Sequence, residues 1–475
     1  MKFARTAAPT GHNPALPGGQ GMRIPRAHSI VEQVTSDWKL VSVLIVSLFL
    51  DNLRVPVGGG LFNVRPSFVV FAAVFPALAY RWLARREQVQ QTPLLTVLLL
   101  LDGVFFFSTL INPSAPYHLR GLITSVLLLV NIAMYLSIFR FATSSADALD
   151  HIYSLLVGLA SVYALLAVLA LALFELGFGP ARYLVQLSDI GDLTMNGGTT
   201  ATPHPLLLDP NMGSYLGAIG VMALIRSIFS AGRTRLWLAV ASVGIFVGVL
   251  LSYSRGAWLA TSSGLVAASV IVLITRQWIS LPPVRLAAVV TIFALAVAGS
   301  LVVAPSVKTV LAARVANLLN IQAGTGSQRL AFWERITEDG LRKPLLGHGS
   351  DAYRALLPPP PPSCRSCGPY VAENITVEVF HTSGLVGLAV YLALQVLTVS
   401  LLIRALRRSR DRAIPQRGLA IAAAAGYLTI TLASQTNPSF WGNMYWALLA
   451  VVVVSAAEAA APFPSRDARK SVIGV

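Results

Sequence analysis

The chain of 475 residues contains only two cysteines, Cys364 and Cys367. They stand in a CxxC spacing without a second cysteine pair or a matching histidine pair, which excludes a complete four-ligand zinc site. We expect the two cysteines to form a disulfide that staples a local loop. A redox pair and half of a metal site are the alternatives.

Charged residues are also scarce, at 12% of the chain, whereas hydrophobic residues make up 55%. Soluble domains do not have this balance. Apolar runs of about 18 residues or more recur along the chain, and each can cross about 30 Å of hydrocarbon. The alternating pattern of a membrane barrel is absent, so helices must satisfy the backbone hydrogen bonds. The sequence therefore predicts an all-α, multi-pass membrane protein.

We predict a bundle of about twelve transmembrane helices with one large extracytoplasmic loop that contains short helices. The predicted spans are 40–57, 66–83, 93–111, 118–139, 151–175, 206–229, 236–251, 256–275, 285–304, 373–403, 418–435 and 439–460. They divide the chain into a disordered cytoplasmic tail (1–38), nine helices (39–304), a large periplasmic loop (305–372), three further helices (373–461) and a second cytoplasmic tail (462–475). Residues 1–38 lack an apolar stretch near Met1, so we expect no cleavable signal peptide.

Acidic residues are few, with 20 Asp and Glu against 36 Lys and Arg and a net charge of +16. No basic cluster is interleaved with aromatic residues outside the predicted spans, so we exclude a nucleic-acid partner and expect membrane lipids instead. The basic residues gather in alternate loops, most densely in 404–417, as the positive-inside rule requires. This pattern places the N-terminus inside and the segments 176–205, 252–256 and 305–372 outside.

Several arginines are predicted at the outer face. Arg255, in LSYSRGAW, either reaches lipid headgroups or offers a fixed cation to a lipid-linked phosphate. Over 327–342 the apolar residues recur at helical spacing, which predicts an amphipathic helix on the outer surface. Its Arg329 and Arg335 either anchor this helix at the interface or help Arg255 to bind a diphosphate. His348, in LLGHGS beyond the helix, is either incidental or a proton carrier.

A second polar group opens the tenth predicted span, in ENITVEVFHTSGLVGL. Asn374, Glu378 and His381 are spaced i, i+4 and i+7 and so share one helix face. Glu373 stands beside them at the mouth of the helix. Glu378 and His381 either satisfy each other inside the bundle or supply a general base at the mouth of a cavity.

Three further features have structural interpretations beside functional ones. Asn211, in DPNMGSYLG, falls at a predicted helix N-terminus, where free N–H groups suit an anion and where ordinary capping is the alternative. Asp102 lies within an apolar span and is predicted to form hydrogen bonds inside the bundle. The turn 436–443, TNPSFWGN, is predicted to be an aromatic anchor at the membrane interface.

In combination, these pieces resemble the O-antigen ligase and polymerase family of bacterial membrane glycosyltransferases. The resemblance rests on DPNMGSYL, SRGAW, the Arg329-xxx-Trp333 spacing that runs into PLLGHG, and EN…GLVGL, and it covers roughly residues 203–400. It implies an active site at the periplasmic face of the bacterial inner membrane, with no metal or other cofactor. The implied donor is an oligosaccharide on undecaprenyl diphosphate. The implied acceptor is another lipid-linked glycan for a polymerase, or lipid A–core for a ligase.

Carried over to this chain, the resemblance implies that Arg255 and Arg329 hold the diphosphate. Asn374 matches the asparagine of an HN pair whose histidine activates the acceptor, but this chain has Glu373 in place of that histidine. We take Glu373 as the base, with His381 and His348 as alternatives, and we favour a polymerase over a ligase. The acceptor hydroxyl would then attack C1 of the donor sugar with inversion.

The alternative function is a lipid-linked glycan flippase or another polysaccharide-export transporter. A transporter is expected to hold its ionisable residues near the midplane and to show inverted repeats. Asp102 and the pair Glu378–His381 favour transport, whereas most polar residues lie at one face and the two halves show no repeat. A polar cavity that opens only at the outer face would favour the enzyme.

Overall fold

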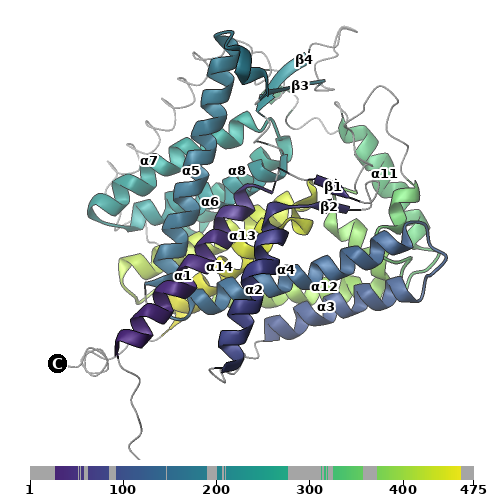
Figure 1. Cartoon of the computed structure of the whole chain (residues 1–475), viewed down its shortest axis with the longest axis horizontal. Helices are drawn as coiled ribbons and strands as arrows, with labels where there is room; N and C mark the ends of the chain where they lie inside the picture. The colour runs from purple at the N-terminus through teal and green to yellow at the C-terminus, as the bar shows by residue number, and fades with distance from the viewer. Residues whose placement is uncertain are drawn as a thin grey trace, which may run out of the picture.

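The computed structural model is built almost entirely of helices (Figure 1). It describes residues 27–275, 325–356 and 372–461 and positions 312, 315, 316 and 318, except for gaps at 52, 54, 58–61, 85–92, 146, 184, 190–200, 206–207 and 209. The predicted span 285–304, the two cysteines, most of the segment 276–324 and the C-terminal tail lie outside the described residues.

Helices occupy every predicted span that the described residues include. They are α1 (Ala27–Phe49), α2 (Pro66–Ala84), α3 (Pro93–Leu110), α4 (His118–Ala142), α5 (Ala148–Glu175), α6 (Pro210–Phe229), α7 (Gly232–Leu251), α8 (Arg255–Ile274), α12 (Ile375–Arg408), α13 (Ile414–Ala433) and α14 (Asn443–Ala460). Eight of these helices are long and apolar enough to cross a membrane. The predicted helical, multi-pass membrane fold is therefore confirmed.

The first helix differs from the prediction at both ends. α1 begins at Ala27, inside the segment expected to be a disordered tail. The reason is visible in SIVEQVTSDW, whose apolar residues recur at helical spacing with no proline after Pro25. α1 also ends at Phe49 rather than near residue 57, and a short antiparallel hairpin follows, β1 (Val55–Val57) with β2 (Phe62–Val64). A second hairpin, β3 (Val185–Asp189) with β4 (Ala201–Pro205), precedes α6.

The centre of the bundle is formed by α13 and α14. α14 is buried along most of its length, and α13 packs against α6, α8 and α14. α13 is rich in alanine and glycine, which lets neighbouring helices approach closely. Phe229 of α6 lies against Gly418, and Met222 lies against Gly426. The small residues of α13 thus allow close packing at the centre of the bundle.

The even-numbered helices α2, α4, α6, α8, α12 and α14 begin at one end of the bundle, which we call the loop end. Side chains of their first turns and of the connecting loops contact each other there, as in the bond from Asn437 Nδ2 to Ser214 Oγ at 3.0 Å. At the opposite end, Arg226 of α6 forms an ion pair with Asp150 of α5 at 2.6 Å. The contacts therefore agree with the alternating orientation that the basic residues predict.

The predicted loop helix is present as α11 (Thr325–Gly340), which packs on α12. In Figure 1 it lies at the right of the molecule, beside the ends of α3, α4 and α12. The chain then continues through PLLGHG, and this segment docks into a break in α12 at Gly384, whose φ is +63°. Leu385 N donates to Pro344 O at 2.7 Å, and His348 N donates to His381 O at 2.9 Å. The glycine-rich loop thereby takes up backbone groups that the broken helix leaves free.

Gly384→Ala is expected to destabilise the protein by several kcal/mol. A left-handed backbone costs an alanine about 1–2 kcal/mol, and its Cβ would overlap the carbonyl group of Leu345. Gly103→Ala is the matched control, because a Cβ at Gly103 of α3 would meet no described atom within 4 Å. Thermal unfolding in detergent, followed by tryptophan fluorescence, should show a large loss for Gly384→Ala and none for Gly103→Ala. Equal melting temperatures would contradict the docking role of Gly384.

Candidate active site

The centre of the site is an ion pair between Arg329 of α11 and Glu373, which precedes α12. Arg329 also donates from Nη1 to Thr436 O at 3.3 Å, in the turn between α13 and α14. The two side chains are 31% and 27% exposed, so both can be reached by a substrate. Three segments far apart in the sequence thus meet at this pair.

The backbone of Glu373 is strained. Its φ is +53°, in the left-handed region that residues other than glycine rarely adopt. Asn374 follows as the N-cap of α12, and its Oδ1 accepts from Val377 N at 3.1 Å. Burial raises the pKa of Glu373, and the guanidinium of Arg329 works in the opposite direction. The ion pair with Arg329 and the helix cap at Asn374 therefore hold Glu373 in its strained conformation at the start of α12.

Arg255 is the first residue of α8, and the start of this helix packs against the turn that binds Arg329. The following Gly256 packs so tightly against Thr436 that a Cβ there would overlap Oγ1 of that threonine. Ser254 caps α8, and its Oγ accepts from Ala257 N at 3.2 Å. Arg329 therefore binds the turn at Thr436, and the start of α8, which carries Arg255, packs against the same turn. A helix N-terminus with two arginines is suited to an anion.

Asn437 fixes the turn that supports these arginines. Its Nδ2 is 3.0 Å from Ser214 Oγ of α6 and 3.4 Å from Ser254 Oγ at the start of α8. The side chain is buried, so the amide ties three helices together without solvent. The turn 436–443, predicted to be only an aromatic anchor, is thus a structural part of the site. The sequence does not reveal this role, because the contacts of Thr436 and Asn437 with Arg329, Ser214 and Ser254 join residues more than 100 positions apart.

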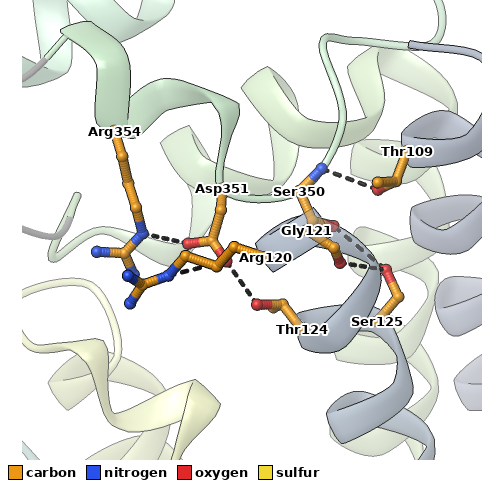
Figure 2. A network of polar contacts seen from close by, with 8 residues as sticks. All are labelled: Thr109, Arg120, Gly121, Thr124, Ser125, Ser350, Asp351 and Arg354. Atoms are coloured by element: carbon orange, nitrogen blue, oxygen red, sulfur yellow. Dashed lines mark hydrogen bonds and ion pairs between the residues drawn. The ribbon is translucent and has the colours of Figure 1, made fainter. Parts of the chain in front are cut away.

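Asp351 organises a second polar network at the loop end (Figure 2). Its carboxylate forms an ion pair with Arg354, lies 3.8 Å from Arg120 Nε of α4, and accepts a hydrogen bond from Thr124 Oγ1. Figure 2 shows both arginines pointing toward this one carboxylate. Next to it, Ser350 N donates to Thr109 Oγ1 of α3 at 3.0 Å. The network fixes the large loop to the first turn of α4 and the last turn of α3.

Asp351→Ala is expected to cost about 3–5 kcal/mol of stability, because it leaves two largely buried guanidinium groups without their shared carboxylate. The matched control is Asp150→Ala, whose carboxylate also pairs with an arginine but is 65% exposed. That pair is worth about 0–1 kcal/mol. Thermal unfolding in detergent should separate the two variants clearly. Similar melting temperatures would show that Asp351 does not stabilise the loop.

Glu378 and His381 do not pair with each other, although both lie on the face of α12 that the spacing predicts. Glu378 forms a hydrogen bond with Tyr353 and lies near Arg354. It is 5% exposed, and His381 is 1% exposed. Both groups are therefore shielded from a substrate at the loop end, in contrast to Glu373.

His381 and His348 share one carboxylate partner, Asp339 at the end of α11. His381 Nε2 lies 3.0 Å from Asp339 Oδ2, and His348 Nε2 lies 3.6 Å from the same oxygen and 2.9 Å from the backbone carbonyl oxygen of Asp339. These three groups are of the kind that binds a transition metal. The two imidazole rings stack at an interplanar angle of 18°, and both Nε2 atoms face Asp339. The arrangement favours a hydrogen-bonded clamp that holds α11 on α12.

The remaining predicted site residues are divided between two places. Arg335 Nη1 donates to Leu356 O at 3.0 Å, so it supports the loop away from the Arg329–Glu373 pair. Asn211 lies in the first turn of α6 and lines a small cavity. The predicted disulfide Cys364–Cys367 falls outside the described residues. Arg329, Glu373 and Asn374 are the predicted residues that the structure brings together, and Arg255 begins the helix whose start packs against the same turn.

Strained backbone gathers at the same end of the bundle. Among the described residues, those other than glycine with positive φ are Tyr117, Tyr253, Asp351 and Glu373. Each lies in a turn at the loop end, before α4, before α8, within the large loop and before α12. Such conformations cost energy and are concentrated at functional sites. This distribution favours a functional site at the loop end of the bundle.

These features define a multi-pass helical membrane protein with a polar, arginine-containing site at one end. Residues 240–392 match the family described as O-antigen ligase. The matched segment runs from α7 through the large loop into α12, and so includes Arg255, Arg329 and Glu373. This match supports the assignment of the chain to the O-antigen ligase and polymerase family. A comparison with curated proteins found no match.

Proposed function

We propose that this protein transfers a glycan from undecaprenyl diphosphate to an acceptor glycan at the periplasmic face of the bacterial inner membrane. The observation that carries the proposal is the meeting of Arg329, Glu373 and the start of α8 beside Thr436. The site combines fixed cations with a partly exposed carboxylate. These are the two elements that displacement of a diphosphate by a hydroxyl requires.

The arginines stabilise the leaving group. An acceptor hydroxyl attacks C1 of the donor sugar, the bond from C1 to the phosphate oxygen breaks, and undecaprenyl diphosphate departs with the bonding electrons. Arg255 and Arg329 bind its oxygens through planar guanidinium groups that never lose their charge. Attack from the face opposite the diphosphate inverts the configuration at C1. No metal ion is needed in this scheme, because the guanidinium groups neutralise the diphosphate.

Glu373 takes the proton of the acceptor hydroxyl. In the described state Arg329 pairs with this carboxylate and opposes the effect of burial on its pKa. When Arg329 turns to the donor diphosphate, Glu373 loses that partner and becomes a stronger base. Donor binding and activation of the base are thereby coupled. Because of this coupling, Glu373 becomes a strong base only when a donor is bound.

We favour a polymerase over a ligase because the family's histidine is replaced by Glu373. The purified protein should be incubated with undecaprenyl-linked repeat units, with and without lipid A–core. A ladder of products without lipid A–core is the expected result. Transfer that occurs only with lipid A–core would identify a ligase, and no transfer in either reaction would overturn the proposed function.

A further inference from the structure

A second polar feature lies close to the proposed centre. A cavity at the loop end is lined by Asp51, Arg65, Asn211, Tyr215 and Asn443, with apolar residues between them. These residues come from the end of α1 and from the first turns of α2, α6 and α14. The transfer scheme above assigns no role to this cavity.

Two amide oxygens at the cavity have no hydrogen-bond donor among the described residues, Oδ1 of Asn211 and Oδ1 of Asn443. Asn443 is fully buried, and its orientation is set by Nδ2, which donates to Asp51 Oδ2 at 3.0 Å and to Ser67 Oγ. An amide oxygen that is buried without a donor costs about 1–3 kcal/mol. Both oxygens therefore require a group that donates hydrogen bonds.

The charges around the cavity favour a ligand that carries no charge and donates hydrogen bonds. The N-terminal ends of α2, α6 and α14 carry partial positive charge, and Arg65 adds a full one, which disfavours a metal cation. The carboxylate of Asp51 and the two amide oxygens disfavour an anion. Hydroxyl groups satisfy the oxygens without adding a charge of either sign.

The size of the cavity limits how much of a ligand can enter. Its volume is about 40 Å³. A water molecule needs roughly 10–15 Å³ on the same measure. The space suits one or two hydroxyl groups at the edge of a sugar, and not an entire sugar ring.

The cavity is one turn away from the proposed transfer centre. Pro438 lines it, and the preceding Asn437 binds Ser254, the cap of the helix that begins with Arg255. Thr436, which precedes Asn437 in the chain, accepts the hydrogen bond from Arg329 through its backbone oxygen. The turn 436–443 therefore lines the cavity and also contacts Arg329 and the start of α8.

We propose that the cavity is a specificity subsite for a glycan, in which one sugar hydroxyl donates to Asn211 Oδ1 and a second hydroxyl or a bridging water donates to Asn443 Oδ1. The proposal rests on the proposed glycan transfer and adds which part of the substrate is recognised. A sugar that lacks the hydroxyl leaves buried oxygens unpaired and is rejected.

The test uses the full-length protein in nanodiscs and the undecaprenyl-diphosphate-linked glycan extracted from the producing cells. Asn211→Ala should raise the KM for this substrate about 10- to 100-fold with kcat nearly unchanged, because it removes a contact to the sugar and not to the leaving group. Binding of undecaprenyl diphosphate without a glycan should be unaffected. Asn211→Ser, which keeps a short polar side chain at the helix start, should show a smaller increase in KM.

Asn131→Ala is the matched control, since Asn131 is also buried with an Oδ1 that lacks a partner among the described residues, but lies in the middle of α4. If the wild type transfers glycan and the KM of Asn211→Ala equals that of the control, the cavity holds water only and the subsite is disproved while the function stands. If the wild type transfers nothing, binding of the free glycan released by mild acid decides the subsite by itself. Weaker binding in Asn211→Ala supports it, and equal or absent binding overturns it.

Discussion

Arg255→Ala is expected to lower the rate of glycan transfer by about 10²–10³-fold or more, because one fixed donor to the developing negative charge is lost. The arginine opens α8 at the loop end, beside the turn that also receives Arg329. Arg255→Lys should lie between the wild type and Arg255→Ala, since lysine keeps the charge but lacks the planar pair of donors. Polymer length and turnover with undecaprenyl-linked repeat units measure the effect.

Arg404→Ala serves as the control for the loss of one positive charge. Arg404 lies near the end of α12, on the opposite side of the bundle, and its hydrogen bond to Ser400 O is exposed. This variant should keep full activity, and all variants should be present in the membrane in equal amount. Full activity in Arg255→Ala would remove Arg255 from the diphosphate site.

Glu373→Gln is expected to reduce turnover by about 10²–10⁴-fold, the usual contribution of a general base. Glutamine has the same shape but cannot take a proton, and it also cannot form an ion pair with Arg329. Single-turnover measurements at saturating donor separate the chemical step from binding. If kcat stays within a few-fold of the wild type, the base is another group.

Glu373→His tests the same role by a change in pH dependence. A general base works only when deprotonated, so the rate falls as the pH drops through its pKa. Burial raises the pKa of Glu373 above the ordinary value of a glutamate, and the acid limb of the wild-type profile should move with it. Histidine has an ordinary pKa of about 6.5, and burial lowers the pKa of a histidine where it raises that of a glutamate, so the variant should retain activity with its acid limb moved from the wild-type position. An unshifted profile would argue against residue 373 as the base.

The membrane spans could be predicted because hydropathy and length act locally. A run of apolar residues is stable in a bilayer only as a helix, whatever its neighbours are. The limits of α3 and α5 therefore fall within a few residues of the prediction. The end of α1 could not be predicted, because Asp51 is held by its bonds to Ser67 and Asn443, and Asn443 is nearly 400 positions away.

The candidate site could be predicted only in part. The helical spacing correctly places Glu378 and His381 on one face of α12, but it does not reveal their partners. The partners are Tyr353, in the loop before α12, for Glu378, and Asp339, at the end of α11, for His381. Helical spacing within α12 carries no information about residues in other segments. In the same way, His348 was a candidate proton carrier, whereas its main contacts dock the loop into the break at Gly384.

The amino-acid sequence was sufficient to predict a multi-pass helical membrane protein, the approximate positions of its described helices, and Arg255, Arg329 and Glu373 as candidates for one chemistry. These properties depend on hydropathy, helical spacing and residue type, which act over a few neighbours. Only the tertiary structure decided that Arg329 meets Glu373 at Thr436, that Glu378 and His381 are shielded, and that Asn211 faces a cavity with Asn443. Such contacts depend on how distant helices pack, and packing is a property of the whole chain.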